Sequence, residues 1–256
     1  MTTTSTFFFL FYKGDLLLTS ALAVPCCESL PVSLSEGQTL HRLPDLNGHP
    51  CRTANLDAPV TAEGWTMMPL RETFDHLPTD VYGMAGKAYE ILYWDKNTRF
   101  CGICGAPMEL HTDISKRCTS CGKEVWPALK TAIIVAVTRN NGKEILLVQS
   151  NKFKKDYMGL VAGFVETGET LETCVHREVM EETNVRIKNL RYFASQPWPY
   201  PSGLMVGFTA EYDGGELQLQ YSELNKGGWF SRDNMPDIPG KVSLARRLID
   251  AWLEKQ

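Results

Sequence analysis

Long apolar runs, a surplus of positive charge and low-complexity segments are all missing from this sequence. No apolar run approaches the roughly 20 residues that a membrane-spanning helix needs. The formal net charge of −4 gives no general affinity for nucleic acid, so a polyanionic substrate would need a metal ion or a local basic patch. With 43% hydrophobic and 22% charged residues in a chain of 256, the composition predicts a globular protein of one or two domains.

The N-terminal run "FFFLFY" has no basic residue before it, and Lys13 and Asp15 interrupt the apolar stretch that follows. A secretory signal would need a charged first region and a small-residue cleavage site, which Ala21–Leu22–Ala23 matches only faintly. We therefore predict a strand, the turn "KGD" and a second strand "LLLTS". The expected compartment is the cytoplasm.

Four of the eight cysteines form two CxxC pairs, separated by thirteen residues. Spacing of this kind predicts a tetrahedral four-thiolate site in a reducing compartment, and zinc in such a site stabilises the fold and does not act in catalysis. The alternative, a pair of redox-active CxxC motifs, fits the spacing less well. The predicted zinc ligands are Cys101, Cys104, Cys118 and Cys121.

These cysteines divide the chain into three predicted domains, which are an N-terminal α+β lobe (1–96), a zinc ribbon (97–127) and a larger domain (128–256). In the lobe, "DLNGHP" contains an Asn-Gly turn signal, and "DVYGMAGKAYEILYWDKN" has helical periodicity. The lobe contains no residue pattern that predicts chemistry of its own.

The larger domain combines strand and helix signals. "TAIIVAVTR" and "EILLVQSN" flank Asn141–Gly142, which predicts a hairpin, and "NLRYFASQPW", "LMVGFTAEYD" and "GELQLQ" predict further strands. Helices are predicted for Thr170–Glu182 and for "KVSLARRLIDAWLEKQ", with Ser243 as N-cap. Strands with two helices, without regular βα alternation, predict an α/β (α+β) sandwich around a mixed sheet.

The first of these helices crowds three carboxylates, Glu178, Glu181 and Glu182, at helical neighbour positions where like charges repel. A solvated acidic face is one interpretation. The other is a cage for divalent cations, because Mg²⁺ prefers oxygen ligands and bridges carboxylates to substrate phosphates. Asn184 stands where a helix often ends in a left-handed residue. Apolar residues at the same spacing predict the face toward the core: Leu171, Cys174, Val175, Val179 and Met180.

Residues 163–185 read "GFVETGETLETCVHREVMEETNV" and resemble the Nudix box, with Asn184 where the family usually has Gly. The resemblance implies a pyrophosphatase acting on nucleoside diphosphates linked to another group. It further implies that the glutamates of "EVMEE" bind Mg²⁺ or Mn²⁺, that Arg177 orients a glutamate by ion pairing, and that Glu169 has a supporting role.

A second motif, "SQPWPYPSGLM", is by itself a rigid turn between strands with packed aromatic side chains. It also resembles the SQPWPFP signature of the NADH pyrophosphatase branch, also known as NAD-capped RNA hydrolases, with Tyr200 in place of Phe and Gly203 where Ser is frequent. The resemblance implies a loop that contacts a nicotinamide or adenine ring. The residues concerned are Ser195, Gln196, Pro197, Trp198, Pro199, Tyr200, Pro201 and Ser202.

Further roles are carried over from the same branch by position. Phe164 would stack on a substrate base, the Ala162 carbonyl would bind a metal, and Glu223 would lie near the metals. Substrate contacts are implied for the Ala245 backbone, for Asp113, for Trp126 in place of a family Tyr, and for Arg71 of the first lobe.

The implied reaction is hydrolysis of the pyrophosphate of NAD(H) to NMN(H) and AMP, extending to NAD caps at RNA 5′ ends, with Glu182 or Glu223 as base. A basic cluster at Lys152, Lys154 and Lys155 is either a solvated loop or a guide for phosphates or RNA. Rival functions are a Nudix pyrophosphatase for ADP-ribose or dinucleoside polyphosphates, and a non-catalytic zinc-ribbon module that binds NAD or RNA. A homodimer formed through the first lobe and the ribbon is expected from the resemblance.

Overall fold

The computed structural model describes residues 5–152 and 156–254, which form two compact units. The first unit comprises residues up to Ala128 together with Pro199–Ser202, and the second comprises Leu129–Trp198 and residues from Gly203 onward. Lys154 and Lys155 of the predicted basic cluster lie outside the described residues. In the described part of the chain, no helix is both long and apolar enough to span a membrane.

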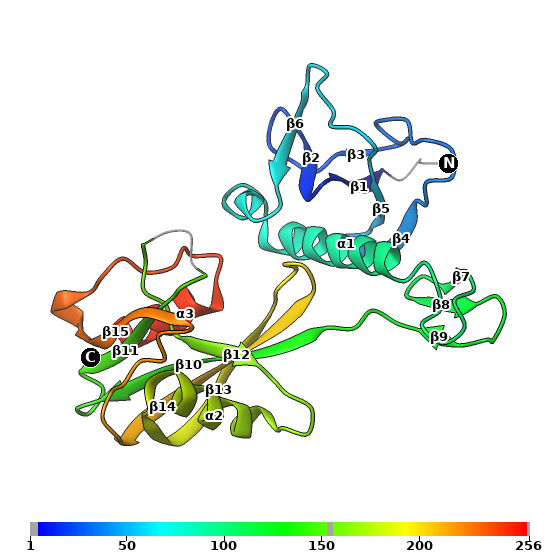
Figure 1. Ribbon diagram of the computed structural model, residues 1–256. Helices are drawn as coiled ribbons and strands as arrows, with labels where there is room; N and C mark the ends of the chain where they lie inside the picture. The colour runs from blue at the N-terminus through cyan, green and yellow to red at the C-terminus, as the bar shows by residue number, and fades with distance from the viewer. Residues whose placement is uncertain (1–4, 153–155, 255–256) are drawn as a thin grey trace. The chain divides into compact units, whose positions relative to one another are not determined.

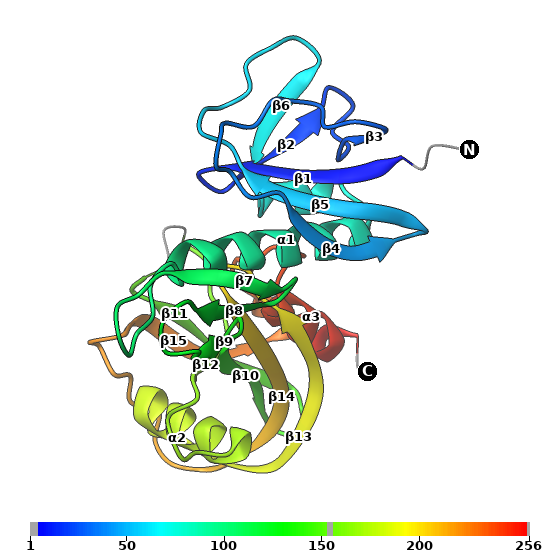
Figure 2. The same cartoon turned by 90° about the vertical axis from the view of Figure 1, so that its right-hand side faces the viewer.

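The first unit contains a six-stranded sheet in the order β4-β5-β1-β2-β6, with β3 paired to β1 (Figure 1). Its strands are β1 (Thr6–Tyr12), β2 (Asp15–Thr19), β3 (Cys26–Cys27), β4 (His41–Leu46), β5 (His49–Asn55) and β6 (Trp65–Pro69). The 3-10 turn η1 (Glu72–Asp75) and the helix α1 (Thr79–Asn97) follow. Figures 1 and 2 show α1 along one face of this sheet.

The predicted N-terminal hairpin is confirmed. β1 and β2 are antiparallel with Phe11 opposite Leu16, and the turn between them has positive φ at Lys13 (49°) and Gly14 (99°). Both turn residues are therefore left-handed, which matches the twist of the flanking strands. Alternate residues of β1 face opposite sides, so Phe9 packs beneath α1 while Leu10 packs in a smaller cluster on the other face.

Three short strands form the ribbon, in the order β7-β8-β9: β7 (Met108–Thr112), β8 (Ser115–Cys118) and β9 (Glu124–Val125). Lys116 of β8 is buried and joins the ribbon to the end of α1, because its Nζ lies 2.7 Å from a carboxylate oxygen of Asp95. His41 Nε2 lies 3.4 Å from the other oxygen. Burial acts to raise the pKa of Asp95, but the His41 and Lys116 side chains lower it to about 2.

The second unit is built on a mixed sheet in the order β13-β14-β10-β11-β15, with β12 also paired to β10. Its strands are β10 (Lys130–Arg139), β11 (Glu144–Ser150), β12 (Val161–Phe164), β13 (Arg186–Pro197), β14 (Gly203–Gly214) and β15 (Leu224–Ser231). β10 runs parallel to β14 and antiparallel to β11, as a mixed sheet requires.

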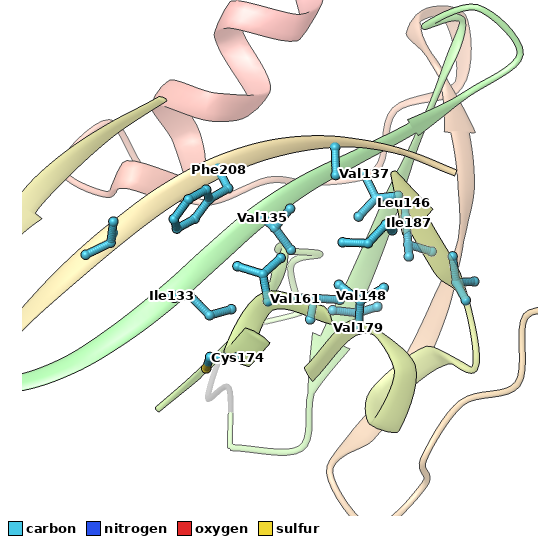
Figure 3. Packing of buried hydrophobic residues seen from close by; sticks show 14 of the residues in the cluster. Ile133, Val135, Val137, Leu146, Val148, Val161, Cys174, Val179, Ile187 and Phe208 are labelled. Atoms are coloured by element: carbon cyan, nitrogen blue, oxygen red, sulfur yellow. The ribbon is translucent and has the colours of Figure 1, made fainter. Parts of the chain in front are cut away.

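Helices α2 (Leu171–Thr183) and α3 (Leu244–Leu253) cover opposite faces of this sheet, and the turn η2 (Arg232–Asn234) follows β15. Ile133 and Val135 of β10 pack in the same cluster as Cys174 and Val179 of α2, as Figure 3 shows. Ile134, between them, packs with α3. The predicted α/β (α+β) sandwich with a mixed sheet, an N-terminal α+β lobe and a ribbon is confirmed.

Two predictions for this unit were wrong. The segment "GELQLQ" is not a strand, because the backbone N–H of Gln218 and Gln220 donates to carbonyls at the end of α2 and not to a neighbouring strand. The edge strand is instead β15, in "LNKGGWFS", where two glycines weaken the local strand signal. Met180, predicted to face the core, is exposed because the apolar face of α2 is narrow.

Candidate active site and zinc ribbon

Helix α2 has a defined beginning and end. The Thr170 side chain caps its N-terminus by accepting a hydrogen bond from the Thr173 N–H (3.1 Å). Asn184 ends it with φ of 56°, the left-handed conformation that was predicted, and donates its N–H to the Met180 carbonyl. With both ends fixed and Val175 fully buried, the polar face of the helix has a set orientation.

Arg177 is the centre of the charged face. A guanidinium has five N–H donors, and each has a matching oxygen here. Nε and Nη2 bind the two oxygens of Glu169 (2.6 and 2.9 Å), and Nη1 binds Glu178 (2.9 Å) and Glu181 (3.0 Å). Nη2 also donates to the Phe164 carbonyl (3.0 Å). Arg177 thus joins the loop before α2 to two carboxylates of the helix.

Glu169 is an anchor for this arginine. Its two oxygens face Arg177, and one also accepts a hydrogen bond from the Glu166 N–H (2.9 Å). The hydrogen bonds from Arg177 and then from Glu166 lower the pKa of Glu169 to about 2. The carboxylate is therefore charged at all physiological pH values and is committed to holding Arg177.

Glu178 lies directly against the backbone of β12. A Cβ added at Gly163 would overlap the Glu178 carboxyl group, so any larger residue here would force that carboxyl group to move. Burial is the main cause of the raised pKa of Glu178, which the hydrogen bond from Arg177 opposes. Gly163, the first residue of the segment that resembles the Nudix box, thus leaves space for the carboxyl group of Glu178, fifteen positions later in the sequence.

Glu182 is the most deeply placed of the acidic residues, with 6% of its surface exposed. Burial, together with the charges of Glu178 and Glu223, raises the pKa of Glu182 to about 8. The segment carrying Glu223 is tied to the helix, since the Gln220 N–H donates to the Glu182 carbonyl (2.9 Å). Lys152 Nζ lies 3.9 Å from Glu223 and is exposed. The carboxyl group of Glu182 is thus buried near other carboxylates, and it has no ion pair with a described side chain.

The four ribbon cysteines lie together, with their sulfur atoms all within 4.8 Å of one another. The Sγ–Sγ distances are 3.6 Å for Cys101–Cys121 and 3.5 Å for Cys104–Cys118. Four thiolates about 2.3 Å from a central zinc would be separated by roughly 3.8 Å, so the set fits a tetrahedral zinc ion.

Backbone N–H groups of one ribbon turn favour the thiolate form of Cys118. Those of Cys121 and Ser120 donate to Cys118 Sγ at 3.4 Å and lower the pKa of its thiol to about 6. In the described part of the chain, only the cysteines bring three or more metal-binding side chains this close; the glutamate oxygens are more widely spread.

Comparisons with known proteins agree with these two sites. The chain matches the NUDIX domain over residues 128–252, the NADH pyrophosphatase zinc ribbon domain over 96–125 and the NADH pyrophosphatase-like rudimentary NUDIX domain over 5–94. It is 39% identical to a NAD-capped RNA hydrolase NudC of Deinococcus radiodurans, over 95% of this chain and 86% of that protein. The chain belongs to the Nudix hydrolases, in their NADH pyrophosphatase branch.

A second sequence relative and one solved structure are also similar to this chain. A NAD-capped RNA hydrolase NudC of Pseudomonas aeruginosa is 41% identical, over 84% of this chain and 77% of that protein. A solved NUDIX hydrolase from Nitrosomonas europaea is 23% identical and covers 62% of this chain and 92% of its own, with a TM-score of 0.51. At that identity the structural likeness shows the fold alone.

In this Nudix domain, Ala162 and Phe164 are exposed residues of β12, opposite Ile134 and Ala132 of β10. Phe164 has 62% of its surface exposed, while its carbonyl is held by Arg177. The carbonyl of Phe164 is thus bound by Arg177, while its ring is largely exposed. Their predicted roles, like those of the glutamates, stay predictions.

The proline-rich motif divides between the two units. Ser195, Gln196 and Pro197 end strand β13, and Gln196 Nε2 donates to the Val242 carbonyl (2.7 Å). Trp198 closes the base of the connection, with its N–H donating to the Gly203 carbonyl (2.8 Å). The residues between them belong to the first unit: Pro199, Tyr200, Pro201 and Ser202.

The remaining predicted contacts are spread over both units. Ala245 is the second residue of α3, after the Ser243 N-cap that the sequence predicted, so its N–H is among those a helix leaves unpaired by its own carbonyls. Asp113 is exposed in the turn between β7 and β8, and Trp126 is exposed after β9. Arg71 lies over the Tyr200 ring, 5.9 Å from its centroid.

Proposed function

We propose that this Nudix hydrolase cleaves the pyrophosphate of NAD(H) to NMN(H) and AMP, and that it removes NAD caps from RNA 5′ ends. The observation that carries the proposal is a complete acidic helix with its organising Arg177, in a chain that resembles NAD-capped RNA hydrolases over 95% of its length. A non-catalytic binding module would have no need of carboxylates held in this way.

Glu178, Glu181, Glu182, Glu223 and the Ala162 carbonyl would hold Mg²⁺ or Mn²⁺. These are hard oxygen donors, and their mutual repulsion around the buried Glu182 is what a divalent cation would relieve. When bound, the metal neutralises phosphate charge and lowers the pKa of a coordinated water. Glu182 or Glu223 would accept the proton of the attacking water, and Arg177 would keep Glu178 and Glu181 in position.

Substrate recognition would use the exposed Phe164 ring and the Ser195–Ser202 loop. A flat nicotinamide or adenine ring stacked on an aromatic side chain gains about 1–3 kcal/mol by analogy with single-stranded nucleic-acid binding. The Oε1 of Gln196 is buried and has no hydrogen-bond partner among the described residues, while Nε2 of the same amide donates to the Val242 carbonyl. The Ala245 backbone, Asp113, Trp126 and Arg71 are further proposed contacts.

The test is a product assay with NADH and Mn²⁺, followed by chromatography for AMP. Glu178→Gln should abolish AMP formation, because an amide is a weaker metal ligand than a carboxylate. Glu172→Gln is the matched control, since Glu172 is an exposed carboxylate in the first turn of the same helix. AMP from the wild type and the control, and none from Glu178→Gln, supports the proposal.

The other outcomes separate the rivals. No AMP from folded, zinc-loaded protein would overturn NAD(H) as substrate, and turnover of ADP-ribose or a dinucleoside polyphosphate would assign the rival Nudix activity. Binding of NAD or RNA without turnover of any nucleotide would indicate the binding module. NAD-capped RNA, compared with the same RNA carrying a triphosphate, tests the cap activity separately.

We further propose three domains at 1–96, 97–127 and 128–256, a homodimer formed through the first lobe and ribbon, and a cytoplasmic location. The ribbon's exposed apolar side chains, among them Phe100, Ile103 and Trp126, support an interface there. Light scattering at micromolar concentration tests the dimer, and a monomer would exclude it.

A further inference from the structure

Residues Pro199–Ser202 connect β13 to β14, yet they pack as part of the first unit. Tyr200 packs against the apolar cluster beneath α1, and its hydroxyl lies 2.7 Å from the hydroxyl of Tyr82. The Arg71 guanidinium lies over the Tyr200 ring, 5.9 Å from its centroid. The family signature has Phe at this place, so the hydroxyl pair comes from the Tyr that this chain has instead.

The contact with α1 also depends on a glycine. A Cβ added at Gly86 would lie 3.1 Å from Cγ of Pro199, closer than two carbon atoms normally approach. Gly86 is buried, whereas Gly83, one turn earlier on α1, is exposed and has open space around its Cα. The missing side chain of Gly86 therefore leaves space for the Pro199 ring, whereas no described residue occupies the corresponding space at Gly83.

We propose that Tyr82 and Gly86 are positioning residues that fix the Pro199–Ser202 segment and thereby the substrate-recognition motif of which it is part. The inference rests on the proposed NAD(H) hydrolysis. Neither residue belongs to the motif, and neither is assigned a contact with substrate. Their effect is on the apparent affinity for the dinucleotide and not on the bond cleavage at the acidic helix.

The physical reason is preorganisation. The Trp198–Gly203 hydrogen bond fixes the base of the connection, and the contacts with α1 fix its tip. A loop that is already ordered loses less conformational entropy when substrate binds. Burial also raises the pKa of both Tyr82 and Tyr200, so the two phenols stay neutral and can keep their hydrogen bond.

The decisive experiment compares Gly86→Ala with Gly83→Ala by steady-state kinetics with NADH and by thermal unfolding. Alanine favours a helix over glycine at both positions. Gly83→Ala should leave KM and kcat unchanged. Gly86→Ala should raise KM roughly 3- to 10-fold by displacing Pro199, with kcat within about twofold of the wild type and little change in melting temperature.

Equal kinetics for the two alanine variants would overturn the proposal, and so would a fall in kcat without a change in KM. If Gly86→Ala fails to fold, the hydroxyl pair gives the same test. Tyr82→Phe and Tyr200→Phe should each raise KM roughly 2- to 10-fold, because each removes the hydrogen bond between the two hydroxyls. In the double variant, the fold increase in KM should be smaller than the product of the two single increases.

If the KM increases of Tyr82→Phe and Tyr200→Phe simply multiply in the double variant, Tyr82 has a structural role only. The same holds if these variants change the melting temperature alone. The control for the proposed function is the wild type itself. If it releases no AMP from NADH, the proposed activity has failed. If the wild type does release AMP, but every variant above has an unchanged KM, only the positioning role has failed.

Discussion

Replacing Glu182 with glutamine removes a buried carboxyl group whose ionised form is destabilised in the folded protein. Burial raises the pKa of Glu182 to about 8 from an ordinary value of 4.5. Between about pH 4.5 and 8 the folded protein holds a proton that the unfolded chain has released. The free energy of unfolding therefore decreases as pH rises through this range. The full effect, reached above pH 8, is at most about 5 kcal/mol, and relaxation of the site will reduce it.

The assay is thermal unfolding from pH 5 to 8.5 in buffer without divalent cations, for the wild type and for Glu182→Gln. The melting temperature of the wild type should decrease relative to that of the variant as pH rises. Because Glu178 is shifted in the same direction and its charge acts on Glu182, the difference between the proteins reports Glu182 together with its coupling to Glu178. Mn²⁺ should stabilise the wild type more at high pH than at low pH, since it competes with the proton. Parallel curves for the two proteins without metal would refute the reasoning.

Three further outcomes are expected. Gly163→Ala should reduce AMP formation to the level of Glu178→Gln, because its methyl group would occupy the place of the Glu178 carboxyl; activity near that of the wild type would contradict this geometry. Arg177→Lys should lower kcat by roughly 10²-fold, since an ammonium cannot reproduce five directed N–H bonds, and near-normal kcat would show that charge alone suffices. Cys118→Ser should reduce zinc content from about one ion per chain and lower the melting temperature, as measured by elemental analysis and calorimetry; retained zinc would contradict a four-thiolate site.

Local sequence signals predicted much of the fold, and they did so where backbone conformation decides structure. The "KGD" and "NNGK" turns require positive φ, which Gly and Asn adopt easily, and the structure has it at Lys13, Gly14, Asn141 and Gly142. The end of α2 at Asn184 follows from the same preference. In each case a few adjacent residues contain the whole signal.

Predictions were wrong where neighbours distant in sequence decide the outcome. The alternating "GELQLQ" has a strand pattern, but its N–H groups bind the carbonyls that α2 leaves free at its C-terminal end. Gly227 and Gly228 weaken the signal of β15, yet the paired edge of β11 supplies the ladder. Both errors reflect tertiary partners that a single segment does not reveal.

In the candidate site, too, the sequence predicted the local relations and not the contacts between residues distant in sequence. The sequence placed the three glutamates on one helix and Arg177 beside them, because those relations are local. It did not predict how unequally the glutamates are buried, with Glu182 nearly enclosed and Glu181 half exposed. It also gave no sign of Tyr82, whose partner lies 118 residues away in sequence. Such contacts become visible only once the chain is folded.

The central position of β10 has a consequence for how the protein is made. β10 is paired with β11, β12 and β14, and its parallel register with β14 joins Lys130 to Gly203 and Thr138 to Glu211. One edge of this very apolar strand therefore stays open until the ribosome has delivered residues 140–211. Long-range parallel pairing of this kind is slow, and an open apolar edge favours association with other chains. Newly synthesised chains should thus depend on chaperones until β14 docks, which makes temperature and expression rate the practical controls on yield.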